Sequence, residues 1–259
     1  MSLGTHTLNF YMAPMVHWPE VMVTYESSEK ILFSADGFGK FGALDYEDPE
    51  GWACEARRYY FNIVGKYGAP VQALLKKAAG LDIQTICPLH GPVLNENLGY
   101  YIGLYDTWSS YKPEDKGVLV AYASIHGNTA HAAKTLKSKL EGKGAQVTMC
   151  DLTATDLSYA VASAFYCGKL VLASSTYDGG LFPPMREFLE HLRTKGFRNR
   201  RVGLIEDGSW APAAARLMRT KLEEMKDIHL YETVVSLRGA LNQTSEAQMD
   251  ALVAELCAE

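Results

Sequence analysis

Strand-like and helix-like segments alternate through the second part of this 259-residue chain, from Gly117 onward. Five apolar runs of strand length stand at residues 117–124, 145–152, 169–176, 201–208 and 228–237. Between them, apolar side chains recur three and four positions apart, which is helical spacing. This alternation predicts a parallel sheet covered by helices on both faces, joined by right-handed crossovers. Ligands of such a sheet bind beyond the carboxyl ends of its strands.

The first part of the chain follows a different pattern. It predicts a strand at 6–14, a hairpin at 21–36, a helical stretch at 54–81 with a break at Gly68–Pro70, a short strand at 82–91 and a helix at 98–111. The sequence KPEDKG (112–117) combines proline with charged residues, which is typical of a linker. We therefore expect two domains, residues 1–112 and 117–259.

The composition narrows the class of protein. Hydrophobic residues make up 47% and charged residues 21%, which favours a folded globular chain. The formal net charge is −5 and no basic run occurs, so nucleic acid is not an expected partner. No apolar run reaches the roughly 18 residues of a membrane span, and the N-terminus lacks signal-peptide features. The five scattered cysteines, without a C-x-x-C pair, indicate a reduced cytoplasmic setting.

The loop SIHGNT (124–129) lies between the first of these strands and a helix. Gly127 allows a tight turn, while Ser124, Asn128 and Thr129 carry side-chain donors. The free N–H groups of the helix terminus add a site for an anion, so the loop predicts phosphate binding without a salt bridge. The alternative interpretation is an ordinary strand–helix connection with Thr129 as the N-cap.

Two further loops follow the third and fourth strands, SSTYDGG (174–180) and EDGSWAP (206–212). They place Tyr177 and Trp210 at the same sheet edge as the SIHGNT loop. Aromatic faces on either side of a slot suit a flat conjugated ring. Alternatively, each aromatic residue packs against the protein or anchors an interface.

These three loops together resemble those of the flavodoxin family, whose ligand is FMN. The resemblance covers about residues 117–259 and implies a flavodoxin-like doubly wound parallel five-stranded sheet with strand order 2-1-3-4-5. It implies that the FMN phosphate is held by Ser124, His126, Gly127, Asn128 and Thr129. It also implies that the ring is bordered by Thr176, Tyr177, Asp178, Gly179 and Gly208 and stacked on Trp210.

Three acidic residues stand near the predicted ring. Negative charge from Asp178, Glu206 and Asp207 would disfavour an anionic reduced flavin and lower its potential. The alternative is that these carboxylates point to solvent, an interpretation that is at least as strong for Asp207. The loops contain no general acid–base pair, and the chain has no G-x-G-x-x-G fingerprint of nicotinamide binding.

Three segments of the first part, APMVHWPEVMVTY (13–25), LFSADGFG (32–39) and CPLHGPV (87–93), also resemble a known family. They are similar to the second half of the metallo-β-lactamase-like domain of flavodiiron proteins, which join that domain to a flavodoxin domain. The resemblance implies His17, Asp36 and His90 as iron ligands, since His and carboxylate ligands suit non-haem iron. Alternatively, Asp36 is a turn residue and His90 a strand-end residue bonded to backbone.

The chain departs from this family in one respect. The upstream H-x-E-x-D-H motif, which supplies the other ligands, is absent, so three of the usual six ligands remain and the iron site is incomplete. Two His and one carboxylate also have the composition of a facial site for one metal. A partial metallo-β-lactamase-like α/β region would expose strand edges and an apolar face. We expect self-association, docking of a missing N-terminal half, or adaptation into a smaller module.

The resemblance implies an FMN-binding electron-transfer flavoprotein of flavodiiron type. Its partners would be a rubredoxin-like protein or a reductase, and a second copy in a head-to-tail dimer. Complete relatives reduce O2 or NO at a diiron centre, which this chain would do only with the missing half supplied. Two alternatives stay open: an FMN-dependent reductase of small acceptors such as quinones, and a non-catalytic truncated product whose first half is a dimer interface.

Overall fold

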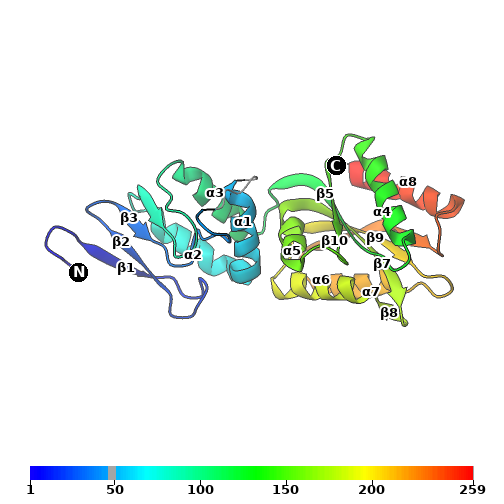
Figure 1. Ribbon diagram of the computed structural model, residues 1–259, viewed down its shortest axis with the longest axis horizontal. Helices are drawn as coiled ribbons and strands as arrows, with labels where there is room; N and C mark the ends of the chain where they lie inside the picture. The colour runs from blue at the N-terminus through cyan, green and yellow to red at the C-terminus, as the bar shows by residue number, and fades with distance from the viewer. Residues whose placement is uncertain (46–50, 259) are drawn as a thin grey trace. The chain divides into compact units, whose positions relative to one another are not determined.

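The structure is a computed structural model that describes residues 1–45 and 51–258 (Figure 1). The chain splits into two compact units, Met1–Lys112 and Pro113–Glu259, which are described separately. No helix within the described residues has both the length and the apolar content needed to cross a membrane.

The second unit is built on a sheet of parallel strands in the order β10-β9-β7-β5-β6. These strands are β5 (Asp115–Ala123), β6 (Val147–Asp151), β7 (Cys167–Tyr177), β9 (Arg200–Asp207) and β10 (Ile228–Leu237). In chain order this is 2-1-3-4-5, so the predicted flavodoxin-like sheet is confirmed. A short strand that the sequence did not predict, β8 (Gly180–Leu181), pairs antiparallel with the end of β7.

Helices cover both faces of this sheet, as Figure 1 shows. They are α4 (Asn128–Glu141), α5 (Leu157–Tyr166), α6 (Pro183–Thr194), α7 (Ala214–Glu223) and α8 (Gln243–Cys257). Helices α4 and α8 lie together on one face, where Leu136 and Leu252 are fully buried against Val120 and Val171. Helices α5, α6 and α7 cover the other face. All five strands therefore end at one edge, flanked by helices.

The boundary between the two units falls between Lys112 and Pro113, whereas the sequence predicted a separate linker. The expected linker, residues 112–117, is partly strand, because β5 already begins at Asp115. The Asp115 carboxylate accepts a hydrogen bond from the Gly117 N–H at 2.5 Å, and Asp115 is in register with Cys167 of β7. A register shift follows before Val118. Charged residues thus extend the strand at its start, where the apolar pattern has not yet begun.

The first unit contains a four-stranded sheet in the order β1-β2-β3-β4. Its strands are β1 (Leu8–Met12), β2 (Met22–Glu26), β3 (Ile31–Phe33) and β4 (Thr85–Cys87). The first three pair antiparallel, and β4 pairs parallel with β3. Its α-helices are α1 (Trp52–Tyr59), α2 (Gly68–Ala78) and α3 (Leu98–Ser109).

The helical stretch in this unit breaks earlier than predicted. A π-helical turn at Tyr60–Val64 and a 3-10 turn at Gly65–Tyr67 come between α1 and α2. Pro70 stands in the first turn of α2, where a missing N–H costs nothing. Gly68 is needed for packing, because a Cβ there would lie 2.4 Å from the Ser109 carbonyl oxygen.

The two faces of the first sheet differ in how they are covered. Val23, Tyr25, Leu32 and Ile86 are buried on one face. Strand register places apolar side chains on the other face as well, and these are about half exposed: Phe10, Met12, Met22 and Phe33. A sheet with apolar residues on both faces is typical of the inner layer of a sandwich.

Candidate functional site

The SIHGNT loop connects β5 to α4 at the carboxyl edge of the second sheet. Gly127 has φ of 92° and caps α4, so the alternative interpretation of Thr129 as the N-cap is wrong. The Ser124 Oγ accepts a hydrogen bond from the Gly127 N–H at 3.1 Å, and a Cβ at Gly127 would meet open space. The first-turn N–H groups have no partner within the helix. An anion fits this position, next to the positive end of α4.

The Thr129 side chain turns away from this space. It is fully buried, and its Oγ1 lies 2.9 Å from the Ser175 Oγ and donates to the Asp207 Oδ2 at 3.3 Å. Its backbone N–H stays in the first turn, but its hydroxyl is engaged inside the protein. His126 is exposed and Asn128 is half-buried at the helix start.

The SSTYDGG segment is a β-hairpin and not an open loop. Thr176 pairs with Leu181 and Tyr177 with Gly180, and the turn residues Asp178 and Gly179 have φ of 49° and 67°. Two residues with positive φ form the two-residue turn that suits the strand twist. Tyr177 is 51% exposed on the hairpin, 5.8 Å from the Phe182 ring.

Thr176 supports the neighbouring loop through its side chain. Its Oγ1 accepts hydrogen bonds from the Ala213 N–H at 2.9 Å and the Ala214 N–H at 3.2 Å. Those N–H groups open α7, whose N-cap residue offers no side-chain bond of its own. The Thr176 hydroxyl therefore fixes the start of α7, which leaves its backbone as the part available to line a ring.

The loop after β9 carries the most exposed large apolar side chain in the described residues, Trp210, at 87%. Gly208 begins this loop, and a Cβ there would lie 2.8 Å from the Pro212 Cα. The tight return of the chain at Gly208 thus leaves Trp210 projecting from the sheet edge. Tyr177 and Trp210 stand outside the hydrogen-bonded network described above, and both side chains are exposed, although Tyr177 also contacts the Phe182 ring.

The acids beside these aromatic residues are held by the protein. Glu206 accepts from the Ala215 N–H and the Ser236 hydroxyl, both at 3.0 Å. Asp207 is buried and accepts from the Gly239 N–H at 3.0 Å as well as from Thr129, so the interpretation that it points to solvent is wrong. Asp178 is the exposed acid of the three.

Two residues at this edge of the sheet, Ser175 and Gly239, were not predicted from the sequence as site residues. Both follow from topology, since small residues at strand carboxyl ends in a parallel sheet lie at one edge. The segment after β10 had no aromatic or glycine-rich motif to mark it, although a Cβ at Gly239 would lie 4.0 Å from the Asn128 Nδ2.

In the first unit, the three residues predicted as metal ligands lie together. The His17 Nε2 is 3.2 Å from the Asp36 Oδ2, and the His90 Nε2 is 3.3 Å from the Asp36 Oδ1. Asp36 is largely buried, whereas the His90 side chain is 57% exposed. The cluster therefore has a buried carboxylate with one imidazole on each oxygen.

Backbone hydrogen bonds hold the two loops of this cluster against each other. The Leu89 N–H donates to the Ala35 carbonyl at 2.8 Å, and the Lys40 N–H donates to the His90 carbonyl at 3.2 Å. Tyr59 packs 5.8 Å from the His90 ring, and burial together with the Asp36 charge raises the pKa of the Tyr59 hydroxyl. Asp36 is a turn residue, as the alternative interpretation had it, and its carboxylate contacts both imidazoles.

The spacing of the cluster can be compared with metal coordination. Two donors that are each about 2.0–2.2 Å from one first-row ion, at roughly 90–109°, lie about 2.8–3.6 Å apart. Each His–Asp36 pair has this spacing, but on a different oxygen. Within the described residues no group of three or more His, Cys, Asp or Glu side chains could hold one ion. His17, Asp36 and His90 alone would therefore need further ligands before they could hold a metal.

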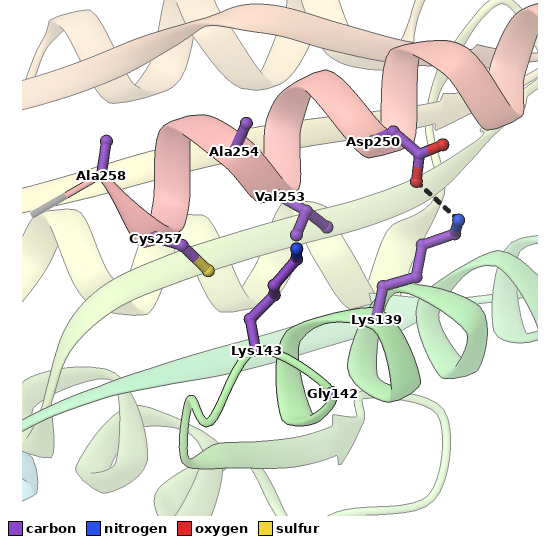
Figure 2. Close-up of a pocket in the computed structure, with 8 residues that line it drawn as sticks. All are labelled: Lys139, Gly142, Lys143, Asp250, Val253, Ala254, Cys257 and Ala258. Atoms are coloured by element: carbon purple, nitrogen blue, oxygen red, sulfur yellow. Dashed lines mark hydrogen bonds and ion pairs between the residues drawn. The ribbon is translucent and has the colours of Figure 1, made fainter.

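A pocket of about 640 Å³ lies elsewhere, between the C-terminal parts of α4 and α8. Figure 2 shows Lys143 and Cys257 on its two sides and the ion pair between Lys139 and Asp250, whose Nζ and Oδ1 are 2.6 Å apart. Helix α4 starts at the carboxyl edge of the strands, so its C-terminal end lies at the opposite edge. The pocket is therefore separate from the loops described above.

Comparison with known proteins shows what the chain is similar to. No protein-family model matches it. It is 33% identical over 196 residues to an uncharacterized protein of Methanocaldococcus jannaschii, covering 74% of this chain and 50% of that protein. It is 27% identical over 261 residues to an anaerobic nitric oxide reductase flavorubredoxin of Aliivibrio salmonicida, covering 97% of this chain and 50% of that protein.

Solved structures share its fold over the whole chain. The rubredoxin oxygen:oxidoreductase of Desulfovibrio gigas superposes with a TM-score of 0.91 at 23% identity, covering 100% of this chain and 66% of that chain. A flavodiiron protein of Giardia intestinalis gives a TM-score of 0.92 at 24% identity, covering 100% and 65%. The chain spans about half the length of the two sequence relatives named above.

Proposed function

The chain belongs to the flavodiiron protein family, and from that premise we propose that its second unit binds FMN and carries electrons. One observation carries the proposal. A helix terminus ready for an anion and two exposed aromatic side chains, Tyr177 and Trp210, stand at the same carboxyl edge of a parallel sheet. FMN is an anion joined to a flat ring, and binding at this edge is the rule for such sheets.

The residues divide into two groups in this proposal. The phosphate is held by the first-turn N–H groups of α4, with Ser124, His126 and Asn128 beside them. The ring lies between the hairpin that carries Tyr177 and the loop that carries Trp210, bordered by the backbone of Gly179 and Gly208. Bound FMN supplies the electron-transfer chemistry, and the protein supplies position and electrostatics.

A titration tests this proposal. Adding the apoprotein to FMN should quench flavin fluorescence to a one-to-one end point as the aromatic residues cover the ring. Gly127→Val is the informative variant, because Gly127 has positive φ that a β-branched residue adopts only with strain. It should weaken FMN binding. Wild-type protein that leaves FMN fluorescence unchanged at all concentrations would refute the proposal.

For the first unit we propose that His17, Asp36 and His90 are half of a diiron site. The support is the single buried carboxylate with one imidazole at each oxygen. Iron, once its remaining ligands are supplied, would provide the chemistry that reduces O2 or NO. Iron content measured with and without Asp36→Asn tests the assignment, since the amide removes the carboxylate charge that would hold iron. Iron retained by the wild-type chain and by Asp36→Asn in equal, non-zero amounts would remove Asp36 from the site.

We also propose the type of partner. The names of the relatives join this fold to rubredoxin, which supports a small rubredoxin-type protein, or a reductase, as the electron donor. Rapid mixing of the FMN-loaded chain with reduced rubredoxin should bleach the flavin absorbance. Bleaching no faster than with free FMN would argue against this donor.

A further inference from the structure

Asp207 is a buried acid that the proposed electron-transfer chemistry does not use. It ends β9, is 9% exposed, and accepts hydrogen bonds from the Thr129 hydroxyl and the Gly239 N–H. No Lys, Arg or His of residues 1–45 and 51–258 forms an ion pair with it. Its charge is therefore balanced by dipoles alone, inside the network that holds the start of α4.

Strand geometry separates Asp207 from its acidic neighbour. Side chains alternate between faces along β9, and Asp207 is in register with Ser175, which contacts Thr129 of α4. Glu206 points to the other face, where it accepts from the Ala215 N–H of α7. The two acids are adjacent in sequence, yet only Asp207 reaches the helix start that would hold a phosphate. Glu206 therefore provides a matched control.

Two consequences follow for an anion at that helix start. The Thr129 hydroxyl is engaged by Asp207 and Ser175, so it cannot donate to the anion without breaking a buried contact. The Asp207 charge also lies one hydroxyl group away from the first turn of α4, where it opposes a second negative charge. Both effects act on the phosphate end of a flavin and leave its ring untouched.

We propose that Asp207 is a specificity-determining residue that weakens the preference of the site for a phosphate-bearing flavin over the uncharged riboflavin. The inference rests on the proposed function, because it requires a flavin at this sheet edge. The sequence pattern placed the Asp207 charge beside the flavin ring, whereas here the charge acts on the flavin phosphate.

The test measures the dissociation constants of FMN and riboflavin for each protein and takes their ratio. A loss of folding or loop order affects both flavins, whereas removal of the charge affects only FMN. Asp207→Asn should raise the preference for FMN about tenfold, the effect of a unit charge on a dianion through well-screened protein. Asp207→Ser, which also lacks the charge, should act in the same direction. Glu206→Gln should leave the ratio unchanged.

A second variant tests the hydroxyl without touching Asp207. Thr129→Val in the wild-type background should change the ratio by less than about twofold, because the hydroxyl does not serve the phosphate there. A tenfold loss in the wild-type background would overturn the inference.

The outcomes separate the two proposals. If the wild-type protein binds neither flavin, the proposed function fails and the inference fails with it. If it binds FMN but the Asp207 variants leave the ratio at its wild-type value, the inference alone is overturned.

Discussion

Replacing Trp210 by alanine is the sharpest test of where a flavin ring would lie. Trp210 is 87% exposed, so it contributes little to folding, and Trp210→Ala should change the free energy of unfolding by less than about 0.5 kcal/mol. A Trp side chain offers about 150–250 Å² of surface, and a stacked ring covers about half of it. At about 25 cal/mol per Å² the contact is worth about 2–3 kcal/mol.

Part of that energy offsets the ordering of an exposed loop, at about 0.5–1.5 kcal/mol for such a side chain. The net loss expected is about 0.5–2.5 kcal/mol, or a rise of roughly 2- to 70-fold in the dissociation constant of FMN. Fluorescence titration at fixed salt measures it. Trp18→Ala is the control, since Trp18 is also exposed, at 59%, but lies in the first unit. An unchanged FMN constant for Trp210→Ala, or an equal change for Trp18→Ala, would refute the stacking.

Three further outcomes are expected. Thr176→Val should destabilise the second unit by about 1–2 kcal/mol in chemical unfolding, because two N–H groups at the start of α7 lose their acceptor. Thr176→Ser, which keeps the hydroxyl, should be near neutral. Equal losses of stability for both variants would contradict this role of the hydroxyl. Burial raises the pKa of Glu26, but hydrogen bonds from the Glu29, Ser28 and Thr7 N–H groups outweigh it and lower the pKa to about 2. The folded-state pKa of Glu26 is thus below its unfolded-state pKa of about 4.3. The ionised Glu26 carboxylate therefore stabilises the fold above about pH 4.3, and this stabilisation is lost as the pH falls to about 2. The stability difference between wild type and Glu26→Gln should shrink over that range, and a difference independent of pH would be inconsistent with it. His17→Ala should leave the FMN constant unaltered, and a large change would mean that the cluster at Asp36 and the flavin site are coupled.

The sequence predicted the second unit well because its elements are long and regular. Five strands that alternate with helices permit few arrangements, so the strand order followed from the pattern and the family resemblance. Apolar residues that recur at helical spacing between those strands, among them Leu136, Leu140, Phe188 and Met249, are fully buried. The short hairpin strand β8 was missed, since a two-residue strand has no periodicity to detect.

The direction of individual side chains at the sheet edge could not be predicted. Thr129, Thr176 and Asp207 all belong to loops that the sequence marked, but the structure uses their side chains to hold those loops together. Which polar group faces inward depends on strand register, and register is set by contacts between segments far apart in the chain. A motif locates a loop, whereas the register decides which of its atoms stay free.

In the first unit the sequence pattern misplaced a helix boundary, whereas the family resemblance selected candidate ligands that lie close together in the structure. Its helical break was misplaced, because glycine and proline at residues 68–70 suggested an interruption where α2 in fact begins. His17 and His90 are 73 positions apart, yet each of them contacts Asp36. Only the resemblance connected them in sequence, since no local spacing relates His17 to His90.

We propose that the second unit holds one FMN at the carboxyl edge of its sheet. Equilibrating the purified chain with a mixture of FMN and FAD, and then measuring the identity and amount of flavin released on denaturation, tests this directly. We expect FMN at about one per chain and little FAD. A chain that retains no flavin, or that retains FAD in preference, would contradict it.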